Sequence, residues 1–475
     1  MQRHRQEYIQ KRKGYPCLFL HGQGIFFKKL RRNSQMKLIY GIKDKPKFGQ
    51  LLIFALQQLL AIMAATLVVP VIIGNGMQPA AALFGAGIGT LVYVLFTKAN
   101  SPVFLGSSFA FLGSMAAAFA GGVSMQLGYL GLLLGAAFAG LVYVVIAIIV
   151  KLAGVKWINK LMPAVVIGPT VAIIGLSLAK NAIGDLTKTN IVTGSPYVAL
   201  ICGLITLAVT MLCATYGKKM LKLIPFIIGI LAGYLSATIL YFIGKAADIP
   251  ALMIIDFSAF ANMGSIFALP EFTFLTAFKG IGEINGAYIG TIAAAYVPVA
   301  FVVFAEHIAD HKNLSTIIEQ DLLENPGLHR TLLGDGIGSV AGAIFGGCPN
   351  TTYGESVGCV AITKNASVST IITAAIGAIL ISCIAPFVAF VNTIPSCVMG
   401  GVCMALYGFI AVSGLKMIKN VDLEQNRNLF VVSVILIAGI GGLSLSFGQV
   451  TITNIATALI LGILANLMLG KAKEQ

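Results

Sequence analysis

Two long stretches of this chain contain no carboxylate: no Asp or Glu occurs between Asp44 and Asp185, and none between Glu355 and Asp422. Of its 475 residues, 57% are hydrophobic and only 10% are charged, whereas a soluble domain carries about 25% charged residues. Most of the surface of such a chain must face something other than water. The sequence therefore predicts an all-α polytopic membrane protein.

Apolar runs near the spanning length of about 20 residues recur along the chain, each bounded by charge, Pro or Gly. Fourteen are recognisable, and they divide into a 7+7 arrangement. Because seven is odd, the second half would cross the membrane in the opposite direction to the first. Inverted repeats of this kind are a transporter architecture, with the substrate site near the membrane midplane. The runs lie at 50–73, 79–97, 102–121, 126–150, 162–181, 196–215, 223–244, 286–309, 331–347, 350–363, 367–392, 395–415, 428–446 and 450–469.

The third run of each half is the least regular. One contains Gly106-Ser107-Ser108-Phe109-Ala110-Phe111, and the other contains Asn350-Thr351-Thr352-Tyr353-Gly354-Glu355. Each is rich in hydroxyl groups and follows a helix-breaking Pro. Corresponding interruptions in two halves are the best sequence indication of a binding site. Ser108 and Phe109 are candidates to offer a hydroxyl, a backbone N–H and a ring to a ligand, although core packing accounts equally well for Phe109.

Glu355 ends the second of these interruptions, and a carboxylate at membrane depth is costly unless it has a partner or a function. A carboxylate there can accept two N–H bonds from one flat ligand. Gly354 beside it lets a ligand approach the backbone closely. The structural alternative is that Glu355 pairs with Lys364 or caps a helix.

Glu306 opens the one dense titratable cluster near a predicted span, Glu306-His307-Ile308-Ala309-Asp310-His311. Glu306 lies deepest in the apolar run, so a ligand contact or a proton relay is the favoured role. Asp310 and His311 fit a relay or ordinary solvation at the span's end. His307 and His311 share a helix face and resemble a zinc site, but Ile308 stands where a metalloprotease has Glu.

Two amides, Gln57 and Gln58, lie within the first apolar run. Unpaired amides in lipid are costly, so they either face the site or bridge helices. The eight cysteines contain no Cys-x-x-Cys pair and indicate neither a disulfide framework nor a zinc framework.

The net charge of +15 is concentrated at the start of the chain. Residues 1–50 hold thirteen Lys or Arg against Glu7 and Asp44, a net +11. A nucleic-acid-binding arm is one explanation, but a cytoplasmic basic flank before a first span is the usual cause, so no nucleic-acid partner is expected. Cations at the ends of even-numbered spans predict that both termini are cytoplasmic. They are Lys98, Lys151, Lys156, Lys160, Lys218, Lys219, Lys222, Lys312, Arg330, Lys364, Lys416, Lys419, Arg427, Lys471 and Lys473.

Several segments together resemble the nucleobase/ascorbate transporter family, which includes the xanthine/uracil permeases, and the bacterial uracil permease branch is the nearest in pattern. The resemblance covers the chain from about Met36 to its C-terminus. Residues 1–35 match nothing in that family and are expected to be a disordered basic tail or an upstream extension of the reading frame. The matching segments are Phe54–Thr66, Leu105–Phe111, Ala305-Glu306-His307, Pro326–Arg330, Pro349–Glu355 and Gly358.

The resemblance implies two domains, each built from both halves of the chain. A core domain would comprise residues 36–160 and 271–393, and a gate domain would comprise 161–270 and 394–475. Short antiparallel strands in segments 3 and 10 would hold the nucleobase. The implied protein is a transporter in the plasma membrane, not an enzyme, and a homodimer is one assembly seen in the family.

The resemblance also implies a site. Glu306 and Glu355 would bind the N–H and carbonyl edge of uracil, Phe109 and Gly354 would offer backbone groups, and Tyr353 would line the pocket with Ser108. Protons would be the co-substrate, through Glu306, Asp310 and His311, with the proton gradient as driving force and no cofactor. Both substrates would cross the lipid bilayer by alternating access.

Three positions depart from the family pattern. Ser356 stands where an amide is usual, and Asp310 replaces a His that follows the glutamate by four residues in one branch. Glu355 replaces the Gln common in purine carriers and so favours uracil over xanthine. The alternatives are a purine, xanthine or urate permease, a passive channel, and a membrane-embedded metal-dependent hydrolase built on Glu306, His307 and His311.

Overall fold

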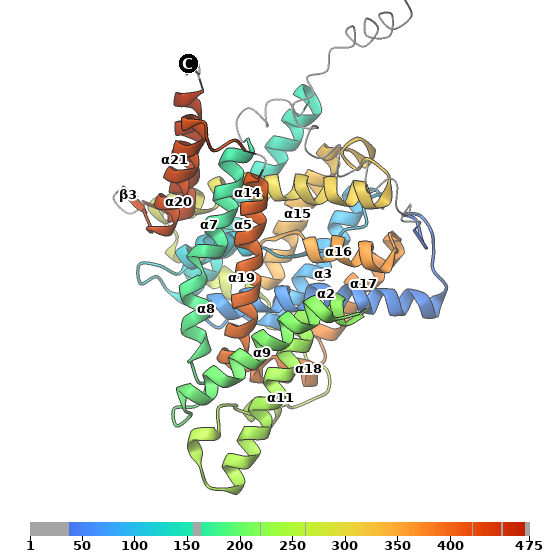
Figure 1. Cartoon of the computed structure of the whole chain (residues 1–475), viewed down its shortest axis with the longest axis vertical. Coiled ribbons are helices and arrows are strands. Elements are labelled where there is room, and N and C mark those ends of the chain that lie inside the picture. Colours follow the sequence, from blue (N-terminus) through green and yellow to red (C-terminus); the bar gives the residue numbers. More distant parts are fainter. Residues whose placement is uncertain are drawn as a thin grey trace, which may run out of the picture. The chain divides into compact units, whose positions relative to one another are not determined.

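The computed structural model describes residues 38–154, 163–218, 220–261, 263–419, 421–447 and 450–470. This part of the chain is mostly helical, with two small antiparallel sheets of two strands each (Figure 1). The basic tail expected at residues 1–35, and the loop cations Lys156, Lys160, Lys219, Lys471 and Lys473, lie outside the described residues.

Seven of the predicted apolar runs fall between Leu38 and Ala246, and each contains a helix or a strand followed by a helix. The elements are α2 (Phe48–Ile73), α3 (Pro79–Phe96), β1 (Leu105–Ser107), η2 (Phe109–Phe111), α4 (Leu112–Ala118), α5 (Met125–Ala153), α7 (Ala164–Ser177), α8 (Ala179–Leu186), α9 (Pro196–Tyr216), α10 (Met220–Leu223) and α11 (Pro225–Ala246).

The connection that follows α11 contains only short helices, and the second set of apolar runs begins at Gly286. The short helices are η3 (Pro250–Leu252), α12 (Ser258–Ala261), α13 (Thr273–Ala277) and η4 (Phe278–Glu283). The remaining elements are α14 (Gly286–Ile318), η5 (Leu323–Gly327), α15 (Leu328–Gly346), β2 (Asn350–Thr352), α16 (Gly354–Thr363), α17 (Val368–Ser382), α18 (Ala385–Thr393), α19 (Ser396–Ile418), α20 (Asn426–Ile440), β3 (Leu445–Phe447), β4 (Val450–Ile452) and α21 (Asn454–Leu469).

Eight helices in the described part of the chain are long and apolar enough to cross a membrane, and four shorter apolar helices accompany them. The prediction of a helical, multi-pass membrane protein is therefore confirmed. The division into fourteen spans and two inverted halves stays a prediction. The run 428–446 is not helical throughout, because α20 ends at Ile440 and Gly442 takes a left-handed φ of 73° before the β3–β4 hairpin.

Helix packing separates the helices into two sets. α3 packs against α15 and α17, α2 packs against α17, and α5 packs against α14 and α15. In the other set, α19 packs against α7, α8 and α9, while α20 packs against α7 and α21. Figure 1 shows α19 running beside α7 and α8, apart from α3 and α15.

Glycine allows the closest of these helix contacts. A Cβ on Gly89 of α3 would lie 2.6 Å from the carbonyl oxygen of Gly338, and a Cβ on Gly338 of α15 would lie 2.7 Å from the carbonyl oxygen of Gly89. The two backbones therefore touch at this crossing, as small residues permit between membrane helices. Both helices also contact the short strands, α3 through β1 and α15 mainly through β2.

The strands β1 and β2 pair antiparallel, with Leu105 opposite Thr352, Gly106 opposite Thr351 and Ser107 opposite Asn350. This confirms the strands expected in segments 3 and 10. Open sheet edges are not tolerated in lipid, so their backbone groups need partners from the protein. Thr90 of α3 supplies one, because its Oγ1 accepts from the N–H of Leu105 at 2.9 Å. The Asn350 side chain also ties β2 to α3, donating to the carbonyl of Gly85 at 3.2 Å.

Candidate functional site

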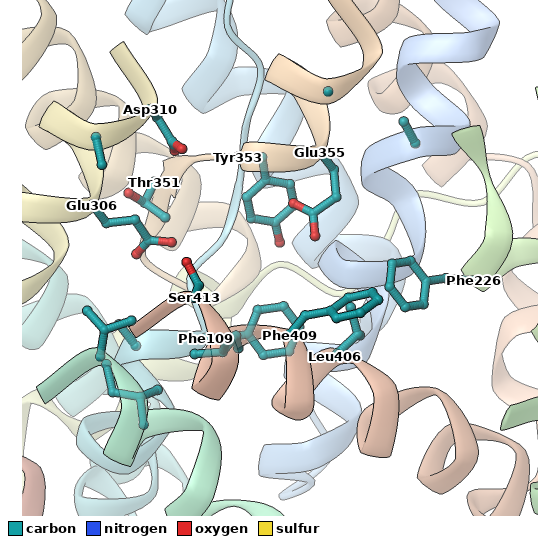
Figure 2. A pocket seen from close by; sticks show the side chains of 18 of the residues that line it. Phe109, Phe226, Glu306, Asp310, Thr351, Tyr353, Glu355, Leu406, Phe409 and Ser413 are labelled. Atoms are coloured by element: carbon teal, nitrogen blue, oxygen red, sulfur yellow. The ribbon is translucent and has the colours of Figure 1, made fainter. Parts of the chain in front are cut away.

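A cavity of about 450 Å³ lies where the short strands and α16 meet α14, α11 and α19. Six of the eight residues predicted for the substrate or the proton line it: Phe109, Glu306, Asp310, Tyr353, Gly354 and Glu355. The β1–β2 pairing brings the segment that contains Phe109 beside the segment that contains Tyr353, Gly354 and Glu355. Helix α14 supplies Glu306 and Asp310 (Figure 2). The volume falls within the roughly 300–1,000 Å³ range of small-molecule sites.

Two of the three cavity carboxylates come from α14. Glu306 and Asp310 are four residues apart and therefore lie on one face of the helix. Asp310 accepts a hydrogen bond from the Thr352 hydroxyl at 3.0 Å, which links α14 to β2. Glu306 lies closer to Ser413 of α19 in Figure 2 and points into the cavity. This face of α14 therefore presents two carboxyl groups, one helical turn apart, to the same cavity.

Glu355 lies opposite, in the first turn of α16. Within the described residues, the one ion pair shorter than 4.0 Å joins His307 to Asp335, so Glu355 does not pair with Lys364. A Cβ on Gly354 would meet only the Asp310 Oδ1, at 3.8 Å. The first N–H groups of a helix have no partner inside it, so the start of α16 brings amide donors to the cavity beside a carboxylate acceptor.

Tyr353, in the second interrupted segment, is held against the first one. Its hydroxyl donates to the carbonyl oxygen of Ser107 at 2.6 Å. Its ring lies against Gly106, where a Cβ would collide with the ring carbons. Only glycine at position 106 leaves room for this ring, which explains why the Gly106 and Tyr353 segments occur together at the site.

Aromatic rings form the side of the cavity that faces α11 and α19. Phe109 is half-buried, and its ring meets Tyr407 of α19 edge to face with centroids 6.4 Å apart. Phe226 of α11 meets Phe409 of α19 in the same way at 5.8 Å. Figure 2 shows Phe109, Phe409 and Phe226 below the carboxylates. A flat ring could lie between an aromatic surface and hydrogen-bonding groups.

Ser108 and His311 are the two predicted residues that do not line this cavity. Ser108 is buried, and its N–H donates to the carbonyl of Pro349 at 2.8 Å. His311 is buried on a face of α14 that does not line the cavity, where its Nδ1 lies 2.8 Å from the carbonyl oxygen of His307 and its Nε2 lies 2.7 Å from the Tyr93 hydroxyl. Ser108 thus holds the backbone of the site, and His311 joins α14 to α3.

His307 also faces protein rather than the cavity. Its Nδ1 lies 2.7 Å from Asp335 Oδ2, and its Nε2 lies 3.0 Å from Thr331 Oγ1. The rings of His307 and His311 stack with centroids 4.1 Å apart. All four ring nitrogens are therefore engaged by protein groups, an arrangement that favours α14–α15 and α14–α3 packing over a metal site.

The sequence interpretation missed Asp335, Lys222, Phe226, Phe409 and Ser413. Like Glu306, Asp335 is a carboxylate inside an apolar run, and this feature of the sequence could have identified it as a candidate. Lys222, Phe226, Phe409 and Ser413 line the cavity. They come from segments whose composition is that of ordinary apolar helices and their basic flanks, so no local signal marks them.

Of the two amides in α2, Gln58 bridges helices. It is buried and donates to the Ser356 hydroxyl, which also accepts from the N–H of Phe104 at 3.0 Å. Ser356, which replaces the family's usual amide, therefore ties α16 to α2 and to the segment that leads into β1. Neither Gln58 nor Ser356 lines the cavity.

We expect Ser356→Ala to lower the thermal stability of the protein in detergent. The change leaves the buried Phe104 N–H and the Gln58 amide without an acceptor, at about 1–3 kcal/mol. Thermal unfolding followed by size-exclusion chromatography measures the shift. Ser177→Ala is the matched control, because that hydroxyl bonds only the Ile174 carbonyl of its own helix. Equal midpoints for the two variants would contradict the bridging role.

The fold resembles that of two solved anion transporters. The transmembrane domain of the cyanobacterial bicarbonate transporter BicA matches with a TM-score of 0.61, covering 91% of this chain and 100% of that chain at 15% identity. Murine Slc26a9 in its inward-facing state matches with a TM-score of 0.60, covering 98% and 74% at 10% identity. At these identities the likeness concerns the fold alone.

Sequence relatives are much closer. The uracil permease of Bacillus subtilis (strain 168) is 39% identical over 451 residues, which cover 93% of this chain and 98% of the relative. The uracil permease of Escherichia coli (strain K12) is 36% identical over 426 residues, covering 89% and 92%. The xanthine/uracil permease profile, described as a permease family, matches residues 49–446. The expected resemblance is therefore confirmed, and this chain belongs to the xanthine/uracil permease family, whose members are transporters and not enzymes.

Proposed function

We propose that the protein is a uracil permease that takes up uracil together with protons. The observation that carries this proposal is the cavity in which Glu306, Asp310 and Glu355 face an aromatic surface. Uracil is a flat ring that presents two N–H donors and two carbonyl acceptors. Carboxylates accept from its N–H groups, and the N-terminal amides of α16 and of the η2–α4 segment donate to its carbonyls. The relatives named uracil permeases support this substrate over a purine.

In this proposal Glu355 and Glu306 hold the two edges of the base, and Phe109, Tyr353 and Gly354 shape the pocket. Ser108 contributes through the backbone that it fixes. The proton is carried by Glu306 and Asp310, which lie one turn apart in the same cavity. A carboxyl group that gains a proton loses its charge and can donate to a carbonyl, so proton and substrate support each other's binding. His311, outside the cavity, acts through its hydrogen bonds to the His307 carbonyl and the Tyr93 hydroxyl.

The proposed transport cycle is alternating access between a core domain (36–160 and 271–393) and a gate domain (161–270 and 394–475). The two sets of packed helices described above support this division, and the cavity is lined from both. We propose fourteen spans in a 7+7 inverted repeat, a place in the plasma membrane with cytoplasmic termini, and a homodimer. The driving force is the proton gradient, with no cofactor.

Uptake of labelled uracil into proteoliposomes tests this function. We expect accumulation when the outside is more acidic than the inside, and its collapse when a protonophore removes the gradient. Unlabelled uracil should compete, and xanthine should not. Equal internal and external uracil at every pH gradient would indicate a passive channel, and strong competition by xanthine would indicate a purine carrier.

A further inference from the structure

The wall of the cavity contains one basic side chain, Lys222, among its described residues. The other titratable groups that line the same cavity are Glu306 and Asp310 of α14, Glu355 of α16 and Tyr353, the residue before α16. No ion pair shorter than 4.0 Å joins Lys222 to any of these carboxylates in the part of the chain described. The cavity wall therefore carries three carboxylates and one solvent-exposed lysine, and in the described residues this lysine forms no ion pair with any of them.

The backbone holds Lys222 close to the helix that carries Glu355. Leu223, the next residue, is buried in a small cluster with Ala61 of α2 and Cys359 of α16. Gly358 lies on the cavity side of α16, one turn beyond Gly354, and a Cβ there would meet no atom within 4 Å. Open space thus runs along α16 from the region of Lys222 toward Glu355. The flexible four-carbon stem of lysine suits such a path.

Lys222 and the carboxylates belong to different sets of helices. α10, which carries Lys222, connects α9 to α11, and these two helices pack together, with α19 against them. Glu306 and Asp310 belong to α14 and Glu355 to α16, on the side of the proposed core domain. A movement of one set against the other therefore changes the separation of cation and acid.

We propose that Lys222 is the counter-ion of the empty site. When uracil and its proton have left, the ammonium group moves along Gly358 and pairs with Glu355, so that the charge of this carboxylate is compensated while the empty transporter returns. Isolated charges at membrane depth are costly, and a partner reduces that cost. In the loaded transporter, the bound proton and the hydrogen bonds of the substrate take the place of this ion pair. The inference rests on the proposed uracil transport.

The proposal separates two measurable processes. Net uptake requires the empty transporter to return, whereas exchange of internal for external uracil does not. In Lys222→Gln we expect net uptake to fall about tenfold, equivalent to about 1.4 kcal/mol in the barrier to return. Exchange of labelled for unlabelled uracil in the same proteoliposomes should stay near the wild-type rate. Lys222→Arg, which keeps the charge, should restore most of the net uptake.

Lys218→Gln is the matched control, because Lys218 is exposed on the same connection and does not line the cavity. We expect it to change neither process. Unchanged net uptake in Lys222→Gln would overturn the proposal. So would an equal loss of uptake and exchange in both Lys222→Gln and Lys222→Met while their elution profiles stay those of the wild type. A wild-type protein without uracil transport of either kind would instead refute the proposed function, and this inference with it.

Discussion

Glu355→Gln should abolish most uracil uptake. The amide keeps the size of the side chain but replaces one of the two acceptor oxygens by an NH2 donor. This donor would face an N–H of the base, with which it cannot form a hydrogen bond. A hydrogen bond to a charged group contributes about 1.5–3 kcal/mol, so we expect uptake at limiting uracil to fall by roughly 10- to 150-fold. Initial rates of labelled uracil uptake, normalised to the protein in the membrane, measure the effect.

Glu424→Gln is the control for this change, since Glu424 is exposed and lies outside the cavity. It should leave uptake within the error of the wild type. Full proton-driven uptake by Glu355→Gln would show that Glu355 is not a substrate ligand. Weakened uracil binding with an intact protein is the accompanying expectation, and calorimetry on the purified variant would detect it.

Gly89→Ala should lower the stability of the protein by forcing a methyl group into the α3–α15 crossing. The new Cβ would stand 2.6 Å from the carbonyl oxygen of Gly338 and 2.5 Å from the side-chain nitrogen of Asn350. A backbone oxygen cannot rotate away, so the helices must separate. Overpacking of this kind costs about 1–3 kcal/mol. We expect a lower unfolding temperature in detergent and less protein in the membrane.

Gly408→Ala makes the same chemical change, but we expect no loss of stability from it. Gly408 is exposed within α19, and a Cβ there would meet no atom within 4 Å. Alanine is the better helix former by about 1 kcal/mol, so this variant should be neutral or slightly more stable. A comparable loss of stability in both variants would show that the close backbone contact is not what limits α3 and α15.

The sequence could predict the parts of the site that deviate from ordinary membrane helix. Glu306 and Glu355 stand out because carboxylates are rare in apolar runs, and the two interruptions stand out through Pro and hydroxyl groups. Their pairing as strands was expected from the family resemblance and is observed. The spacing of His307 and His311 places both on one helix face. Periodicity cannot say which helices that face meets, and here Tyr93 and Asp335 meet it.

The rest of the cavity could not be predicted in this way. In the sequence, Phe226 and Phe409 look like phenylalanines that face lipid. Their place in the cavity wall depends on the packing of α11 against α19. The break between α17 and α18 lies inside one predicted span, and Pro386 at the start of α18 is the sequence signal that marks it. A run of apolar residues alone shows neither where a helix is interrupted nor which of its faces meets protein.

The pairing of β1 with β2 also bears on how the protein is made. Leu105–Ser107 leave the ribosome more than two hundred residues before Asn350–Thr352, their hydrogen-bonding partners. Backbone groups in the bilayer need a partner from the protein, so the third segment must wait near the translocation machinery or in a provisional conformation until the tenth arrives. Chains truncated before Asn350 should therefore be degraded rather than accumulate as a stable half, and the site completes late in biogenesis.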